Sequence, residues 1–193
     1  MKDRTRPSLL ALGLMASLTA SAAGVRSPGM LANTCAGCHG TLGASAGEQM
    51  PSIAGMDNGY LFSVLSDYKT GLRRSTIMGR LMKGYSDQEI WAIAAFFAEQ
   101  PWVSTDRVAR ADQIRVGREI HERQCESCHE DAGRAQDDDS PRMAGQWSGY
   151  LNYALETCRD IGRRCHPNKM GERVMALSDQ EIEALARFYE SEK

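Results

Sequence analysis

Two copies of one short pattern, Cys-x-x-Cys-His, account for most of the cysteines in this 193-residue chain. The copies are Cys35, Cys38 and His39, and Cys125, Cys128 and His129. Two thiols on one helical turn can form thioether bonds with the vinyl groups of a porphyrin, and the adjacent imidazole can then bind its iron. Other interpretations are a redox dithiol, half of a zinc site, or a four-cysteine zinc site made by both copies. The histidine in each copy favours two covalently bound haem c groups.

A haem iron with one histidine ligand needs a second axial ligand or keeps an open position. Of the ten methionines, only Met78 and Met170 are equivalent in the repeat described below, and each is followed by glycine. Met82 and Met175 are the nearest rivals, but their positions are not equivalent. The predicted axial pairs are His39 with Met78 and His129 with Met170. Histidine–methionine ligation raises the reduction potential and closes the iron to small ligands, which suits electron transfer.

The two remaining cysteines, Cys158 and Cys165, have no counterpart in the first half of the chain. In an oxidising compartment such a pair is expected to form a disulfide, which would tie the end of one helix to the loop that carries Met170. One alternative is that a cysteine binds the second iron, which would lower its potential and turn that haem toward catalysis. Another is that His166 competes with Met170 for this iron. His121 is expected to be exposed beside its charged neighbours.

The chain contains an internal repeat at a spacing of 90 to 92 residues. Apart from the two motifs, the matched blocks are Pro51–Gly55 with Pro141–Gly145, Gly59–Leu61 with Gly149–Leu151, Met78–Gly79 with Met170–Gly171, and Ser86–Ile90 with Ser178–Ile182. The arginine pairs Arg73-Arg74 and Arg163-Arg164 also recur, and they could pair with haem propionates or be solvated. A repeat of this length predicts two similar domains rather than a solenoid.

Each half has the pattern of helices joined by loops. Ser86 and Ser178 each precede a glutamate by three residues, the capping-box pattern, and amphipathic helical spacing follows both. Further helices are expected over 28–34, 60–68, 106–124 and 150–157, with Thr105 or Asp106 capping the third. The aspartate-rich segment 130–140 is expected to be a solvated loop. No long alternating run indicates a strand, so the predicted fold is all-α.

The first residues have the order of a secretory signal, with basic residues, then an apolar run over 9–18, then small residues. The run is too short to span a bilayer, and no later segment is long and apolar enough. We therefore expect residues 1–23 to be a cleaved signal peptide of a periplasmic protein, followed by domains at 24–101 and 102–193. A net charge of -2 gives no reason to expect nucleic acid as a partner.

Four segments carry a resemblance to a known family: CAGCHGTLG from Cys35, PSIAGMD from Pro51, STIMGRLMKGYS from Ser75 and AGQW from Ala144. With them the chain resembles the dihaem class I cytochromes c of the cytochrome c4 type, in particular the cytochrome subunits of flavocytochrome c sulfide dehydrogenases. The resemblance implies two tandem class I cytochrome c domains, all-α and related by the internal repeat. It also implies that the carbonyl of Pro51 or Pro141 accepts a hydrogen bond from the iron-binding imidazole.

The resemblance further implies an electron-transfer subunit with no catalytic residues of its own. In that family the cytochrome docks on an FAD-containing subunit that oxidises sulfide, which predicts a heterodimer and a downstream acceptor such as a soluble cytochrome or an oxidase. Since the chain has no G-x-G-x-x-G motif after a strand, the flavin is expected on another polypeptide. The alternative is a free dihaem carrier of the c4 type that feeds a terminal oxidase. A third possibility is a haem enzyme acting at the second iron.

Overall fold

The computed structural model describes residues 26–165 and 167–193, so the predicted signal peptide and His166 lie outside the described residues. Within these ranges the chain is helical and has no strands, which confirms the all-α prediction. The first half contains α1 (Pro28–Asn33), α2 (Ala36–His39), the 3-10 turn η1 (Thr41–Gly43), α3 (Asn58–Thr70), α4 (Met78–Met82) and α5 (Asp87–Ala98). The second half contains α6 (Ala111–Gln124), α7 (Glu130–Gly133), α8 (Ser148–Ile161), the 3-10 turn η2 (Gly162–Arg164), α9 (Asn168–Val174) and α10 (Asp179–Ser191).

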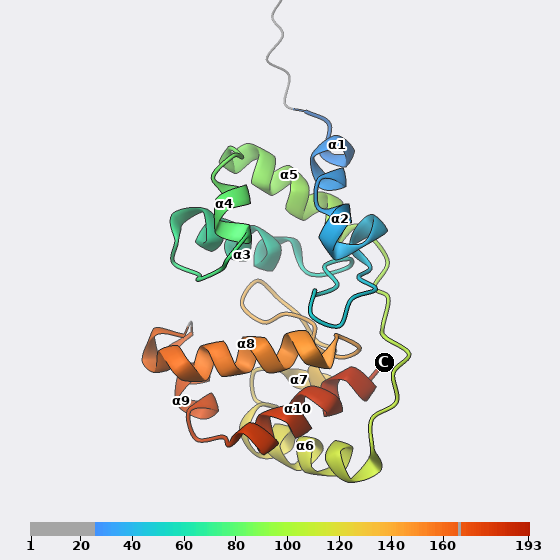
Figure 1. Cartoon of the computed structure of the whole chain (residues 1–193), viewed down its shortest axis with the longest axis vertical. Coiled ribbons are helices and arrows are strands. Elements are labelled where there is room, and N and C mark those ends of the chain that lie inside the picture. Colours follow the sequence, from blue (N-terminus) through green and yellow to red (C-terminus); the bar gives the residue numbers. More distant parts are fainter. Residues whose placement is uncertain (1–25, 166) are drawn as a thin grey trace, which may run out of the picture.

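Each half has its own hydrophobic core, built by equivalent helices. In the first half, α1 and α3 pack against α5, with Leu31 and Phe97 buried between helices. In the second half, α6 and α8 pack against α10 around Ile120 and Phe188. Figure 1 shows the two halves stacked along the long axis of the molecule, with the connecting segment running along one side. None of the helices in the described ranges has the length and apolar character that crossing a membrane requires.

The predicted capping boxes are present at the start of the last helix of each half. The Ser86 hydroxyl accepts a hydrogen bond from the Glu89 amide at 3.2 Å, and the Glu89 carboxylate accepts one from the Ser86 amide at 2.9 Å. Ser178 and Glu181 form the same pair of bonds at the start of α10. Each box satisfies two backbone donors that a helix would otherwise leave unpaired, so it fixes the first residue of α5 and of α10.

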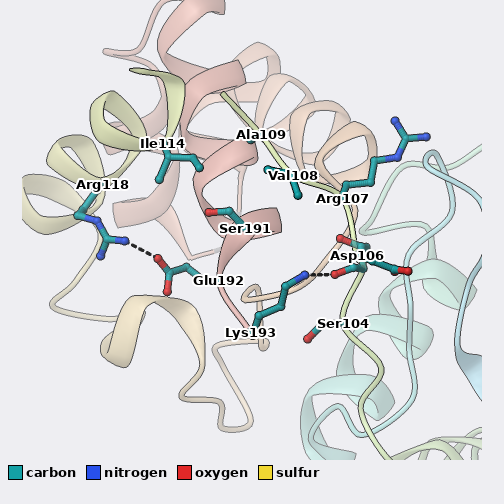
Figure 2. A pocket seen from close by; sticks show the side chains of 11 residues that line it. Ser104, Asp106, Arg107, Val108, Ala109, Ile114, Arg118, Ser191, Glu192 and Lys193 are labelled. Atoms are coloured by element: carbon teal, nitrogen blue, oxygen red, sulfur yellow. Dashed lines mark hydrogen bonds and ion pairs between the residues drawn. The ribbon is translucent and has the colours of Figure 1, made fainter. Parts of the chain in front are cut away.

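The connecting segment, which runs from the end of α5 at Ala98 to the start of α6 at Ala111, is longer than the sequence predicts. The helix predicted to start near Asp106 starts at Ala111, and neither Thr105 nor Asp106 caps it. The Thr105 amide donates instead to the Gly145 carbonyl at 2.9 Å, and the Lys193 ammonium donates to the Thr105 carbonyl. Because both backbone groups of Thr105 are paired with the second half, this segment stays extended. It borders a pocket of about 570 Å³ with the start of α6 and the C-terminus (Figure 2).

The two halves contact each other through equivalent positions of the repeat, Gly59 and Gly149. A Cβ atom at Gly149 would lie 2.8 Å from the carbonyl oxygen of Glu48, and one at Gly59 would overlap the carboxylate of Asp138. Glycine at both positions therefore lets the start of α3 and the start of α8 approach a loop of the opposite half. Because the contact occurs in both directions, the halves are related by an approximate two-fold axis.

Two glutamine side chains complete this interface. The Ser52 amide donates to the Gln146 side-chain oxygen and the Gln146 side-chain nitrogen donates to the Ser52 carbonyl, both at 2.9 Å. Both residues are buried. Gln136 bonds in the same way to the Asp57 amide at 3.0 Å and the Gly55 carbonyl at 2.9 Å. The segment around Gln136 is exposed, as the sequence predicts, and its side-chain amide also offers the donor and acceptor that the facing backbone needs.

Candidate haem sites

The first motif forms a tight helical turn directly after α1. Cys35 precedes α2, and the amides of Cys38 and His39 both donate to its carbonyl, at 3.1 and 2.9 Å. Both thiols are free, with Cys35 half-buried and Cys38 exposed. Burial raises the pKa of the Cys35 thiol, so it is held as the neutral thiol. The turn thus presents two thiols next to a buried histidine.

The His39 ring is oriented by a backbone carbonyl. Its Nδ1 lies 2.9 Å from the carbonyl oxygen of Pro51, the bond that the resemblance implies. Since a carbonyl can only accept, Nδ1 carries the proton and a neutral ring keeps a free lone pair on Nε2. Burial lowers the pKa of His39, and the Pro51 bond offsets this only in part, so the neutral form is favoured. This is the form in which histidine binds iron.

The second motif has the same turn but a different histidine environment. The amides of Cys128 and His129 donate to the Cys125 carbonyl at 3.1 and 2.9 Å. The Nδ1 of His129 is buried and has no partner among the described residues, so the bond implied for Pro141 is absent. The backbone explains the difference, because His39 ends a helix whereas His129 has ψ 65, outside the helical region. Burial lowers the pKa of His129.

The two candidate methionines occupy matching places. Met78 begins α4 and Met170 lies in α9, the short helices that precede the last helix of each half. Both are half-buried, and Met170 packs against the core of the second half. Met82 is buried and Met175 is 54% exposed. The rivals therefore share no common environment, whereas the aligned pair does.

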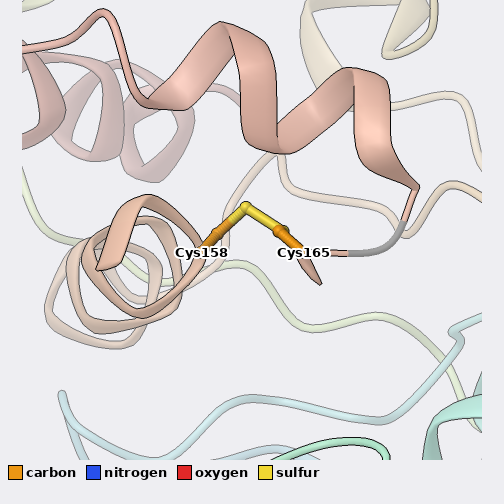
Figure 3. The surroundings of a disulfide bond; sticks show 2 residues. All are labelled: Cys158 and Cys165. Atoms are coloured by element: carbon orange, nitrogen blue, oxygen red, sulfur yellow. A yellow bond between two sulfur atoms is a disulfide. The ribbon is translucent and has the colours of Figure 1, made fainter. Parts of the chain in front are cut away.

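A disulfide joins Cys158 to Cys165, with their Cα atoms 5.1 Å apart (Figure 3). Both cysteines are buried. The bond ties the end of α8 to the segment that leads into α9 and Met170. Because its sulfur is bonded to Cys158, Cys165 is not a free thiolate that could bind the second iron.

Removing this disulfide should destabilise the second half. Cys158→Ser with Cys165→Ser is expected to lower the free energy of unfolding by about 2.5 kcal/mol, because the unfolded chain regains the freedom of a short closed loop. Urea unfolding of the two proteins measures the difference. A thiol reductant should destabilise the wild-type protein to the same degree and leave the variant unchanged. Equal stability of variant and wild type would show that the bond contributes nothing.

A guanidinium group lies where the two halves meet. Arg73 interacts with the hydroxyl groups of Tyr60, Tyr68 and Tyr150, and lies 5.4 Å from the centre of the Tyr68 ring. Tyr60 and Tyr150 are equivalent in the repeat, and burial raises the pKa of all three tyrosines, so they are neutral. The groups that raise the pKa of Arg73 most are these tyrosines and not a carboxylate. A partly buried cation among neutral phenols would be stabilised by an anionic partner.

Three observations fit a haem in each half. Both motifs offer free thiols, burial lowers the pKa of both histidines and favours the neutral ring, and Arg73 lies among neutral phenols where a haem propionate would supply an anion. The four-cysteine zinc interpretation does not fit, because in the part of the chain described no three side chains of His, Cys, Asp or Glu gather as a metal site. The pocket in Figure 2 is lined by none of the candidate cysteines, histidines or methionines.

One histidine is misplaced by the sequence prediction. His121, expected to be exposed, is only 2% exposed and lies between α6 and α10. The signal is present in the sequence, because His121 follows Ile114 and Gly117 at helical spacings of seven and four residues and so shares the buried face of α6. The repeat also aligns it with the buried Leu31.

Two known protein families match this chain, one in each half. The family described as cytochrome c matches residues 29–100, and the family described as cytochrome c oxidase, cbb3-type, subunit III, matches residues 112–188. Each match contains one Cys-x-x-Cys-His motif and one of the two aligned methionines.

Individual relatives extend over both halves. The thiosulfate dehydrogenase electron acceptor of Stutzerimonas stutzeri is 32% identical over 82% of this chain and 78% of that protein. Cytochrome c4 of Pseudomonas aeruginosa is 31% identical over 93% of this chain and 94% of that protein. The cytochrome subunit of sulfide dehydrogenase of Chlorobaculum tepidum is 48% identical, but over only 35% of this chain and 61% of that subunit. The crystal structure of reduced cytochrome c4 from Pseudomonas stutzeri is 26% identical, with a TM-score of 0.77 over 86% of this chain and 97% of that chain.

Proposed function

Because the chain belongs to the dihaem cytochromes c of the c4 type and carries two covalently bound haem c groups, we propose that each motif holds one of them. The proposed attachment residues are Cys35 and Cys38 in the first half, and Cys125 and Cys128 in the second. The proposed axial pairs are His39 with Met78 and His129 with Met170. We place the domains at 24–101 and 102–193, after a signal peptide at 1–23.

The function that these sites support best is transfer of single electrons. A bound haem supplies reversible one-electron chemistry at its iron. The observation that supports the proposal is the hydrogen bond between the His39 Nδ1 and the Pro51 carbonyl, 2.9 Å apart, which leaves the Nε2 lone pair free to bind an iron. Methionine on the other side would close the iron to small ligands, which suits a carrier rather than an enzyme. The protein is therefore not itself a catalyst in this proposal.

We propose that the electron donor is a separate dehydrogenase that oxidises a reduced sulfur compound. One candidate is the FAD-containing subunit of a sulfide dehydrogenase, which would form a heterodimer with this chain. This is supported by the relative that is a cytochrome subunit of sulfide dehydrogenase, over about one third of this chain. The other candidate is a thiosulfate dehydrogenase, supported by a relative that matches both halves. The longer match favours thiosulfate as the first substrate class to test.

The donor is identified by mixing the oxidised dihaem protein with each purified dehydrogenase and its substrate. We expect one enzyme to reduce the haems within the mixing time, as seen in their absorption spectrum. The other enzyme should reduce them slowly. Co-purification with a flavin-containing partner would favour the sulfide dehydrogenase. If neither enzyme reduces the protein but a quinol-oxidising complex does, the sulfur assignment would be wrong and a free c4-type carrier to a terminal oxidase would replace it. We place either carrier in the periplasm.

The charge on Arg73 is expected to favour the reduced, less positive state of a nearby haem. Arg73→Gln should therefore lower at least one of the two reduction potentials, because a partly buried cation stabilises an added electron. Arg74→Gln is the matched control, since the adjacent side chain is exposed and its charge is screened by water. Redox titration followed by absorption measures both. Equal effects of the two variants would contradict a specific role for Arg73.

A further inference from the structure

The second half contains a buried polar network that has no counterpart in the first. The Nδ1 of His121 lies 2.8 Å from the Tyr189 hydroxyl, and its Nε2 is in hydrogen-bond contact with the Glu126 carboxylate. Both His121 and Tyr189 are almost fully buried, at 2% and 1% exposure. Glu126 is the residue that follows the first cysteine of the second motif.

The equivalent positions in the first half are apolar. The repeat aligns Leu31 with His121, Ala36 with Glu126, and Phe97 with Tyr189. Leu31 and Phe97 are buried in the core of the first half, as their counterparts are in the second. Packing alone is thus satisfied by a leucine and a phenylalanine at this helix crossing. The polar network is an addition to the fold rather than a requirement of it.

The network leads from solvent to the second motif. The Glu126 side chain is 46% exposed, so it can exchange protons with water, whereas the imidazole it contacts cannot do so directly. On the inner side, the Tyr189 hydroxyl interacts with the sulfur of Cys125, a proposed attachment atom of the second haem. A proton on His121 therefore has a route to solvent and a position beside the second haem site.

We propose that His121, held by Glu126 and Tyr189, is a proton-binding site coupled to the second haem. This inference rests on the proposed function. When the electron donor reduces that haem, His121 takes up one proton from water through Glu126; when the acceptor withdraws the electron, the proton returns to water. The added electron and the added proton have opposite charge, so each favours binding of the other.

The groups that face His121 from each packed element determine whether reduction of the second haem favours or opposes proton binding at His121. Glu126 comes from the motif turn and Tyr189 from α10, while Cys125 begins the motif and His129 ends it. Once haem is attached, Cys125 is a thioether without charge. Burial raises the pKa of Tyr189, so its hydroxyl stays neutral. The proton of the network is therefore carried by the His121 ring, whose two nitrogens contact Tyr189 and Glu126.

The expected result is a pH-dependent potential for one haem only. Redox titration of the holoprotein from pH 5 to 8 should show two one-electron steps. The reduction potential of the second haem is expected to fall by about 59 mV as the pH rises over this range, which is a tenfold change in its one-electron equilibrium constant. The step of the first haem should stay constant, because apolar residues occupy the equivalent positions.

The double variant His121→Leu with Tyr189→Phe reproduces the pair found in the first half and so keeps the packing. It should abolish the pH dependence of the sensitive step while both haems stay bound. Glu126→Gln tests the route to solvent and should shift the same step. A pH dependence that persists in the double variant, or that affects both haems of the wild type equally, would overturn the inference. A haem content other than two per chain would instead contradict the proposed function.

Discussion

Cys125→Ser combined with Cys128→Ser is expected to reduce the covalently bound haem from two groups per chain to one. Without thiols, the second motif cannot form thioether bonds, although its histidine remains. The second half also loses an apolar group that its core encloses, so it should unfold at lower denaturant concentration than the first half. Mass spectrometry of the denatured protein counts the haems that stay attached, and the alkaline pyridine spectrum gives the haem content independently.

The matched control replaces the other two cysteines of the same half. Cys158→Ser with Cys165→Ser removes the disulfide but leaves both motifs intact, so it should retain two attached haems. Cys35→Ser with Cys38→Ser should also leave one haem, now in the second half. If the control loses a haem, or if the motif variant keeps two, the assignment of the motifs is wrong.

Met170→Ala is expected to lower the reduction potential of the second haem by at least about 59 mV, or tenfold in its one-electron equilibrium. The thioether sulfur of methionine stabilises reduced iron, and its loss also opens a coordination position. Carbon monoxide should therefore bind to one iron of the reduced variant and to neither iron of the wild type. Redox titration and the carbon monoxide difference spectrum provide the two measurements.

Met175→Ala serves as the control for this variant. Met175 lies five residues further along the chain and is 54% exposed, so its removal should leave both potentials unchanged. If Met175→Ala opens the iron and Met170→Ala does not, the axial ligand of the second haem must be reassigned. Met78→Ala should have the same effect on the first haem as Met170→Ala has on the second.

The sequence predicts well where local chemistry determines the structure. The serine–glutamate pairs that begin α5 and α10 satisfy each other within four residues, so their helices start where expected. The disulfide between Cys158 and Cys165 joins residues only seven apart, and the structure forms the bond expected for spare cysteines. The Pro51 carbonyl accepts the bond from His39 that the resemblance implies.

The errors concern residues whose partners are distant in the sequence. Thr105 fails to cap a helix because its backbone is paired with Gly145 and Lys193. The segment around Gln136 is exposed as predicted, but its local sequence does not show that the glutamine contacts the backbone of the other half. His121 has charged neighbours in sequence, but the helix turns it toward Tyr189. Composition and local spacing carry little information about such contacts.

The reciprocal contacts at Gly59 and Gly149 join two halves of one chain, and this affects how their association depends on protein concentration. Two identical subunits that met through such a surface would separate on dilution. Here the connecting segment holds the two halves at a fixed, high effective concentration, so their association does not depend on the concentration of the protein. A single chain also lets the two halves differ, as the His121 network of the second half and the apolar residues at the equivalent positions of the first half do.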